Sequence, residues 1–403
     1  MRARARHPRG FSLVELLVAL VVSAIVIAGA IGLMLGTQRH FESTSAERAL
    51  QDTARVALGH VSANLGNAGF GVDPSLAFDV GPLATVRVDR AYAGLTFASS
   101  SYPTSAGACA GLCRDSTTGP DEIVFFSRDS AFGPHPLTAA VNAASGSLTV
   151  ARVPNVPLRV GQILQVVCYT GSMTWAYVQV SGPVTNNGNG TATIPIAGAG
   201  TNFATQNAWL ADPCYSNVAT MVGNVLDVSS LTTAAEVFKV DRFRYFVQSY
   251  DASGAVRPFG TATARPYLML DQGLGVVTPV VADVEDLQFA YVFPYDAVTP
   301  LVGATPGAAI TNDDAGINLA PANGGPAYSD VPTAVTRQNH HPGNIGAVRV
   351  YLVVRSPDPD LALPNSATLP AAGNRAATAA PPGYHRLLVN TTIAVPNLSM
   401  ASP

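Results

Sequence analysis

The stretch "RGFSLVELLVAL", Arg9 to Leu20, decides how this chain is built. The first ten residues hold four arginines, whereas Leu16 to Leu35 is a run of 20 residues without a charge. At about 1.5 Å per helical residue this run spans ~30 Å, the thickness of a bilayer core. Arginines before it and few after it predict one membrane crossing with a cytoplasmic N-terminus.

Glu15 lies at the start of the apolar segment and requires an explanation. A carboxylate in lipid costs roughly 2.5–3.5 kcal/mol on insertion scales. Cleavage between Gly10 and Phe11 would create an α-amine at Phe11 that can lie against Glu15 of a neighbouring helix. Such an ion pair would also fix the register between subunits. The alternative is a glutamate near the interface whose side chain reaches water.

Three interpretations of the N-terminus compete. An ordinary secretory signal would be cleaved after "AGA", Ala28 to Ala30, so that the mature chain begins at Ile31. A plain membrane anchor would keep the segment. Cleavage after Gly10 also keeps the apolar helix, and this interpretation alone gives Glu15 a role.

The motif "G-FSLVE" resembles the prepilin signal of type IV pilins and of their secretion-system relatives. The resemblance implies that a membrane-embedded prepilin peptidase cleaves between Gly10 and Phe11 and methylates the amine of Phe11. Glu15 is then the assembly residue.

Three glycines, Gly29, Gly32 and Gly36, follow in the apolar helix. Gly32 and Gly36 form a G-x-x-x-G pair, which is typical of close helix packing. Each glycine also costs about 1 kcal/mol of helix stability relative to alanine, so the three could instead make the helix flexible. Both interpretations remain open at this point.

The helix is expected to continue from Phe11 to about Leu65, because apolar residues recur at spacings of three and four up to that point. "GNAG", Gly66 to Gly69, supplies the stop signal. After Gly71 the pattern indicates β structure with long loops. The expected division is a leader at 1–10, a transmembrane half-helix at 11–36, an amphipathic half-helix at 37–69, a β-rich lobe at 70–235 and a carboxyl-terminal pilin lobe at 236–403.

The composition favours a turn-rich β head. Hydrophobic residues make up 48% of the chain and charged residues 12%, and Gly and Pro number 36 and 30. The formal net charge is −3, and no basic run follows residue 10, so nucleic-acid binding is not indicated. The expected strands are Ile123–Phe126, Leu148–Val153, Ile163–Cys168, Trp175–Val180, Thr191–Ile194, Val237–Gln248, Leu287–Phe293, Val348–Arg355 and Arg386–Ile393.

Later segments are similar to PilW-type minor pilins. They are "QDTARVALGHVSANLGNAGFG" (51–71), "DEIVFF" (121–126), "VADVEDLQFAYVF" (281–293) and "IGAVRVYLVVRS" (345–356). The resemblance implies an α+β fold in which a long N-terminal spine helix packs on a large antiparallel β head. One departure is the chain end, "TTIAVPNLSM" (391–400), where Pro396 is expected to shorten the last strand.

Four cysteines in an exported chain suggest two disulfides, with three possible connectivities. We favour Cys109–Cys113 and Cys168–Cys214, because each joins chain neighbours. The spacings do not fit a zinc site.

No catalytic motif is visible, so we expect neither an enzyme nor a cofactor. The pair His340–His341 is expected to be solvated, and Asp283, Glu285 and Asp286 to cap and solubilise a strand. Oxygen-rich segments at 312–318 and 358–360 could hold calcium but lack the EF-hand pattern. Trp175 and Trp209 are expected to anchor the core or its rim.

These observations favour a minor pilin. The resemblance implies assembly with other minor pilins, the major pilin and a large tip adhesin to prime and cap a type IV pilus, a filament of adhesion and twitching motility. The chain would reside in the inner membrane first and at the pilus tip afterwards. The alternatives are a pseudopilin of a type II secretion system and a secreted β-rich binding module.

Overall fold

The structure, a computed structural model, describes residues 12–72, 77–78, 118–142, 145–169, 174–197, 213–230, 234–272, 277–292, 345–360, 363, 368–373 and 375–399. Several residues singled out in the sequence lie outside these ranges: Gly10, Phe11, Cys109, Cys113, Trp209, His340, His341 and the segment 312–318.

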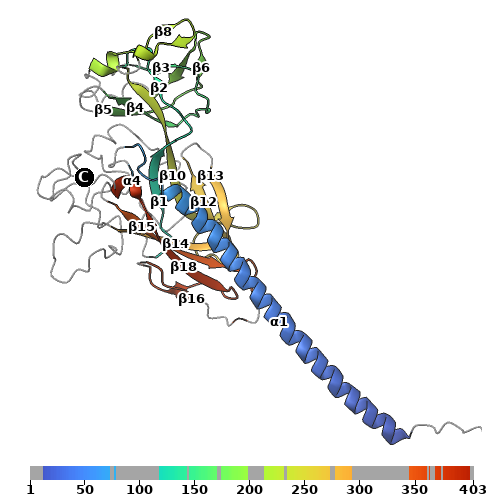
Figure 1. Cartoon of the computed structure of the whole chain (residues 1–403). Coiled ribbons are helices and arrows are strands. Elements are labelled where there is room, and N and C mark those ends of the chain that lie inside the picture. Colours follow the sequence, from blue (N-terminus) through green and yellow to red (C-terminus); the bar gives the residue numbers. More distant parts are fainter. Residues whose placement is uncertain are drawn as a thin grey trace, which may run out of the picture.

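The chain begins with one long helix, α1 (Leu13–Leu65), of 53 residues. At 1.5 Å per residue it is about 80 Å long. Its amino-terminal part extends away from every strand (Figure 1) and none of its most apolar window is buried. Within the described residues it is the single helix long and apolar enough to cross a membrane. The expected helix is therefore confirmed over the described residues, from Leu13 to Leu65.

The carboxyl-terminal third of α1 forms part of the core of the head. Leu50, Ala54, Ala57, Val61 and Leu65 are almost fully buried and recur on one face of the helix. This stripe contacts residues of β13, β15 and β18. The helix is thus a spine that is exposed at one end and packed at the other.

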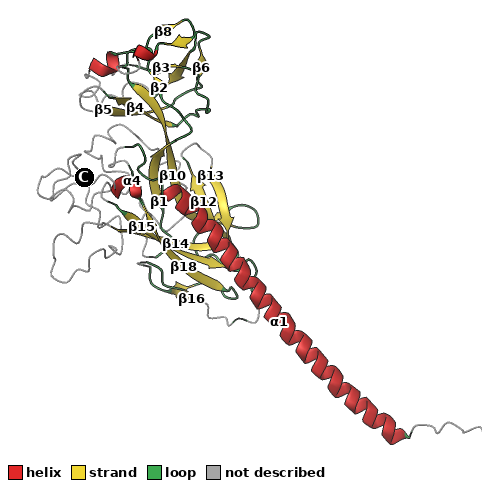
Figure 2. Cartoon of the chain, viewed as in Figure 1, coloured by secondary structure: helices red, strands yellow, loops and turns green. Residues whose placement is uncertain are grey.

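The head is built of antiparallel strands (Figure 2). They are β1 (Ile123–Arg128), β2 (His135–Pro136), β3 (Ser147–Ala151), β4 (Ile163–Cys168), β5 (Thr174–Gln179), β6 (Thr185–Asn186), β7 (Thr191–Pro195), β8 (Met221–Val222), β9 (Val225–Leu226), β10 (Glu236–Tyr250), β11 (Val256–Arg257), β12 (Arg265–Asp271), β13 (Val277–Ala282), β14 (Val284–Val292), β15 (Ala347–Arg355), β16 (Thr368–Leu369), β17 (Thr378–Ala379) and β18 (Arg386–Ala394). Short helices lie at Pro213–Ser216 (η5), Val228–Ser230 (η6) and Pro396–Ser399 (α4).

The 15-residue strand β10 links two lobes of the head. Its first residues, 236–240, pair with β4, and its later residues pair with β1 and β12. We call the part formed by β2–β9 the outer lobe, and the part formed by β1, β12–β15 and β18 the helix-bound lobe. Figure 1 shows β10 running from one to the other. The expected boundary between 235 and 236 therefore falls at the start of a strand whose hydrogen bonds join both lobes.

Each lobe has its own core. The outer-lobe core gathers buried side chains of β3, β4, β5 and β7 with Cys214, Tyr215 and the start of β10. The helix-bound core gathers the α1 stripe with side chains of β1, β12, β14 and β15. A third cluster, which includes Val124, Phe126, Ile163, Tyr177 and Val240, lies where the lobes meet. Trp175 packs half-buried against this cluster.

The carboxyl terminus closes over the end of the spine. Strand β18 ends at Ala394, and Pro396 begins the short helix α4. The Asn397 side-chain amide donates hydrogen bonds to the carbonyls of Gly66 and Ala68, at 3.5 and 3.3 Å. Residues more than 300 positions apart thus satisfy carbonyls at the C-terminus of α1.

Apart from several two-residue strands, two longer strands, β12 and β13, were not predicted. Pro266 lies in β12 and Pro279 in β13, and proline argues against a central strand. Strand β13 is an edge of its sheet, and the register of the β12–β13 pair shifts between Leu268 and Met269, opposite Val281 and Pro279. Edges and bulges are the places where a sheet tolerates proline.

The expectation that Asp283, Glu285 and Asp286 solubilise a strand is wrong, because all three are buried. Asp283 is the single residue between β13 of one sheet and β14 of the other, and its φ of 65° turns the chain between them. Its carboxylate accepts hydrogen bonds from Arg265 at 2.7 and 3.0 Å. Asp tolerates this left-handed conformation better than most residues do.

The other two carboxylates bind β14 to distant segments. Glu285 accepts two hydrogen bonds from the guanidinium of Arg386 at 2.6 and 2.9 Å. Asp286 accepts one from Arg375 at 2.7 Å, and both side chains of this pair are 0% exposed. The burial of these acids is compensated by charge-assisted hydrogen bonds.

Candidate assembly site

The N-terminus of α1 is closed by a capping box. The backbone N–H of Glu15 donates to Oγ of Ser12 at 3.2 Å, and the backbone N–H of Ser12 donates to Oε2 of Glu15 at 3.0 Å. Two of the N–H groups that a helix start leaves without partners are thereby satisfied. The carboxylate also lies at the positive end of the helix dipole. Glu15 therefore has a local stabilising role within its own chain.

The same geometry leaves Glu15 able to receive a second cation. Only Oε2 accepts a hydrogen bond from within the described residues, and the Glu15 side chain is exposed. A carboxylate has lone-pair sites on both oxygens, so Oε1 can accept from an approaching ammonium group. The Glu15 carboxylate is thus held in place by its own helix, while its second oxygen remains accessible to a cation from another chain.

The three glycines lie within an unbroken helix. α1 is α-helical through Gly29, Gly32 and Gly36. A Cβ added at any of the three would meet no atom within 4 Å. No contact within the described part of the chain therefore requires a glycine there. Either packing against another helix or local flexibility remains as the reason for them.

The spine is fixed to the head by polar contacts as well as by its apolar stripe. The Tyr245 hydroxyl, in β10, accepts a hydrogen bond from the Asn64 amide at 2.5 Å and lies 2.8 Å from Nδ1 of His60. Burial raises the pKa of Tyr245 to about 12, with the Asn64 hydrogen bond opposing the shift. The hydroxyl therefore stays protonated near neutral pH and can donate to His60.

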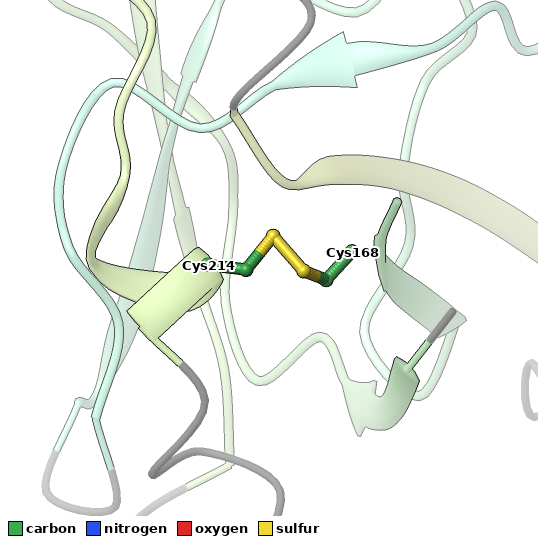
Figure 3. The surroundings of a disulfide bond; sticks show 2 residues. All are labelled: Cys168 and Cys214. Carbon is green, nitrogen blue, oxygen red and sulfur yellow. A yellow bond between two sulfur atoms is a disulfide. The ribbon is translucent and has the colours of Figure 1, made fainter. Parts of the chain in front are cut away.

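A disulfide stabilises the outer lobe. Cys168, at the end of β4, is bonded to Cys214 in η5, and their Cα atoms are 5.9 Å apart (Figure 3). This is one of the two pairings favoured from the sequence. Both residues are almost fully buried in the outer-lobe core. The bond closes a loop of 46 residues, which restricts the unfolded chain.

The described part of the chain contains no group of three or more His, Cys, Asp and Glu side chains placed to hold a metal ion. The acids at 283, 285 and 286 are paired with arginines, as described above. Asp360, in the segment considered for calcium, lies 3.2 Å from Nε2 of His385.

An exposed apolar helix that continues into the core of an antiparallel β head is consistent with an α+β pilin-like fold. Two family models match the chain in agreement with this fold. Residues 5–31 match the prokaryotic N-terminal methylation motif, and residues 244–397 match Type IV Pilus-assembly protein W. Neither the curated proteins nor the solved structures yielded a match.

The two matches confirm the resemblance to PilW-type minor pilins and support a type IV pilin-family protein. The PilW match begins within β10 and ends within α4. It therefore covers most of the carboxyl-terminal strands of the helix-bound lobe and leaves the outer lobe unmatched. The methylation motif covers the expected cleavage position and most of the apolar run.

The sequence reasoning missed one residue of this site, Ser12. The signal was present, because Ser12 and Glu15 form the S-x-x-E pattern of a capping box directly before an apolar run. The contact of Tyr245 with Asn64 could not be found in this way, because nothing local links residues 181 positions apart.

Proposed function

We propose that this chain is a minor pilin of a type IV pilus, and that it assembles with other minor pilins and a tip adhesin to prime and cap the filament. The observation that carries the proposal is Glu15, an acid held by a capping box in an exposed apolar helix. In the bilayer its charge is costly unless a cation neutralises it. The α-amine of a processed neighbouring subunit is such a cation.

Processing precedes assembly in this account. A prepilin peptidase cleaves between Gly10 and Phe11 and methylates the new amine, while the subunit resides in the inner membrane with its N-terminus in the cytoplasm. The amine of one subunit then pairs with Glu15 of the next. A helix displaced by one turn would leave a charge without a partner in lipid, so the pair also selects the register.

The shape of the head supports a place at the tip. The outer lobe extends past the carboxyl end of α1, on the side away from the apolar segment (Figure 1). Within a stack of parallel spines, a subunit above would have to share that space. The last subunit of a filament has no such neighbour. The name of the matched family, which refers to pilus assembly, favours a pilus over a secretion system.

Variants at two positions test the proposal. Glu15→Ala removes the charge and the acceptor of the Ser12 backbone N–H. Glu15→Gln removes the charge and keeps an acceptor. Ser12→Ala removes the hydroxyl that accepts from the backbone N–H of residue 15. Tagged full-length chains are extracted from membranes in detergent, co-purifying pilins are quantified, and surface pili are counted.

We expect both Glu15 variants to lose at least tenfold in co-purification and piliation, while Ser12→Ala retains most of both. If Glu15→Gln assembles like the wild type, the carboxylate serves the cap alone and the proposed role is wrong. Equal protein levels of all variants in the membrane serve as the control.

A further inference from the structure

One edge of the helix-bound lobe is a strand with an unpaired side. Strand β18 (Arg386–Ala394) lies at the edge of the sheet β14–β15–β18, and all nine of its residues pair with β15 in an uninterrupted register. Within the described residues, no strand or other backbone group hydrogen-bonds to its second side. The N–H and C=O groups of a free edge are a template for the backbone of another strand.

Two hydrogen bonds show which backbone groups of β18 face outward. The N–H of Ser356 donates to the carbonyl of His385, and the N–H of Val395 donates to the carbonyl of Gly346, both at 2.9 Å. These bonds flank β18 at its two ends. Within a strand, the side to which a residue points its backbone groups alternates along the chain, so the odd-numbered residues of β18 bond to β15. The outward groups belong to Arg386, Leu388, Asn390, Thr392 and Ala394.

The two outer edges of the helix-bound lobe, β13 and β18, differ in how they are protected. Strand β13 contains Pro279, and its register with β12 shifts beside that residue. Prolines, bulges and charges are the features that keep an edge from pairing with another chain. Strand β18 has neither a proline nor a bulge, and no charged residue lies between Leu387 and Ala394. This edge therefore keeps the ability to pair.

The chemistry of the edge indicates what can bind there. Ile393 belongs to the helix-bound core, and Leu387 and Val389 pack against it. A strand added beside β18 would place every second side chain next to these three, so apolar residues suit those positions. The one charge of β18, on Arg386, is already bound by Glu285. An extended, uncharged segment with apolar residues at alternate positions therefore fits this edge.

A second copy of this chain fits poorly as the occupant. Two β18 edges can pair antiparallel, the more stable arrangement, only about a two-fold axis perpendicular to the sheet. Such an axis reverses the direction of α1, which lies along one face of the sheet (Figure 1). Two spines with the same orientation in one bilayer cannot run in opposite directions. These constraints favour a segment of a different subunit.

We propose that the free edge of β18 accepts an extended segment of another subunit of the pilus complex, which adds to the sheet as a further strand. The segment pairs at least with Leu388, Asn390 and Thr392 through their outward N–H and C=O groups. This inference rests on the proposed function, because that function supplies the other subunits.

Hydrogen–deuterium exchange at single-residue resolution tests the strand addition in the wild-type protein. It compares the detergent-extracted full-length chain alone with the same chain in its complex with co-purifying pilins. The odd-numbered amides of β18 bond to β15 and should exchange slowly in both samples. The even-numbered amides from Leu388 to Thr392 should exchange rapidly in the isolated chain and at least about tenfold more slowly in the complex, because only the added strand protects them.

A proline variant tests the same edge without breaking the sheet. Asn390→Pro removes one outward N–H and leaves the bonds to β15, so the unfolding temperature should stay close to that of the wild type while co-purification of other pilins falls about tenfold. Asn390→Ala is the matched control, because it removes the exposed side chain, keeps the N–H and should assemble like the wild type. Thr391→Pro removes an N–H that bonds to β15 and should instead lower the unfolding temperature.

The outcomes separate the strand addition from the proposed function. If a complex forms that depends on Glu15 but the even-numbered amides still exchange rapidly in it, the strand addition is wrong and the proposed function stands. If these amides are protected in a dimer of this chain alone, the occupant is a second copy and the proposed partner is wrong. If Glu15→Ala leaves assembly intact, the proposed function itself fails.

Discussion

The hydroxyl of Tyr245 lies 2.8 Å from Nδ1 of His60, which joins the longest strand of the head to the spine helix across 185 residues of sequence. The apolar stripe of α1 explains why the helix docks on the sheets. This polar contact, together with Asn64, specifies where along the helix it docks.

The first prediction concerns this contact. Tyr245→Phe keeps the ring in the core and removes the hydroxyl, so the Asn64 amide loses its acceptor. The free energy of unfolding should fall by about 1 kcal/mol, the usual value for one hydrogen bond. Urea denaturation of the detergent-solubilised chain measures it. Tyr250→Phe, at a half-buried hydroxyl that donates to Gln248, is the matched control and should cost less. Equal losses in the two variants would contradict a special role for Tyr245.

The second prediction concerns the disulfide of the outer lobe. Replacing both Cys168 and Cys214 by alanine releases a loop of 46 residues. The chain-entropy estimate for a loop of this length is roughly 4 kcal/mol of lost stability. Thermal unfolding followed by intrinsic fluorescence, with and without reductant, measures it. Reductant should lower the unfolding temperature of the wild type much more than that of the double variant, which keeps only the expected short loop between Cys109 and Cys113. If reductant does not change the unfolding temperature of the wild type, the result argues against the Cys168–Cys214 disulfide.

The third prediction concerns the buried pair of Arg375 and Asp286. Arg375→Met leaves the carboxylate of Asp286 in the core without its cation, which should cost about 3–5 kcal/mol. Burial raises the pKa of Asp286 while the charge of Arg375 opposes that shift, so the single variant should also take up a proton there. The double variant Arg375→Met with Asp286→Leu should recover part of the loss. A double variant less stable than the single one would show that the pair does not act as a unit.

The fourth prediction is a dependence on pH through His135. Burial lowers the pKa of His135 below its ordinary value of 6.5, and the nearby Arg152 acts in the same direction. The unfolded chain therefore binds a proton at a higher pH than the folded chain does. Stability contributed by neutral His135 is complete above about pH 6.5 and falls as the pH drops toward the folded pKa.

Denaturation at several pH values between about 5 and 7.5 checks this dependence. His135→Gln cannot titrate, so its stability should fall less steeply over the same range. Parallel curves for the variant and the wild type would assign the pH dependence to other groups.

The helix and most strands were predictable because their patterns are local. The spacing of Leu50, Ala54, Ala57 and Val61 marks one face of a helix, and all four residues are buried on that face. Runs of β-branched and aromatic residues mark β4, β10 and β15 in the same way. In these elements the buried side chains are the ones that the local sequence pattern predicts to be buried.

What the sequence did not predict depends on distant partners. The acids at 283, 285 and 286 look like surface residues, and only the fold brings Arg265, Arg386 and Arg375 to them. Strands β12 and β13 were obscured by prolines that an edge and a bulge tolerate. The cap formed by Ser12 was not predicted, although its S-x-x-E pattern with Glu15 is local.

The central claim is that this chain keeps its apolar helix after cleavage at Gly10, so that Glu15 can meet the amine of a neighbour. Mass spectrometry of the N-terminal peptide of the protein extracted from its native membrane tests it most directly. The account predicts a mature chain that begins with N-methylated Phe11. A chain that begins downstream of the apolar segment, for example at Ile31, would contradict it.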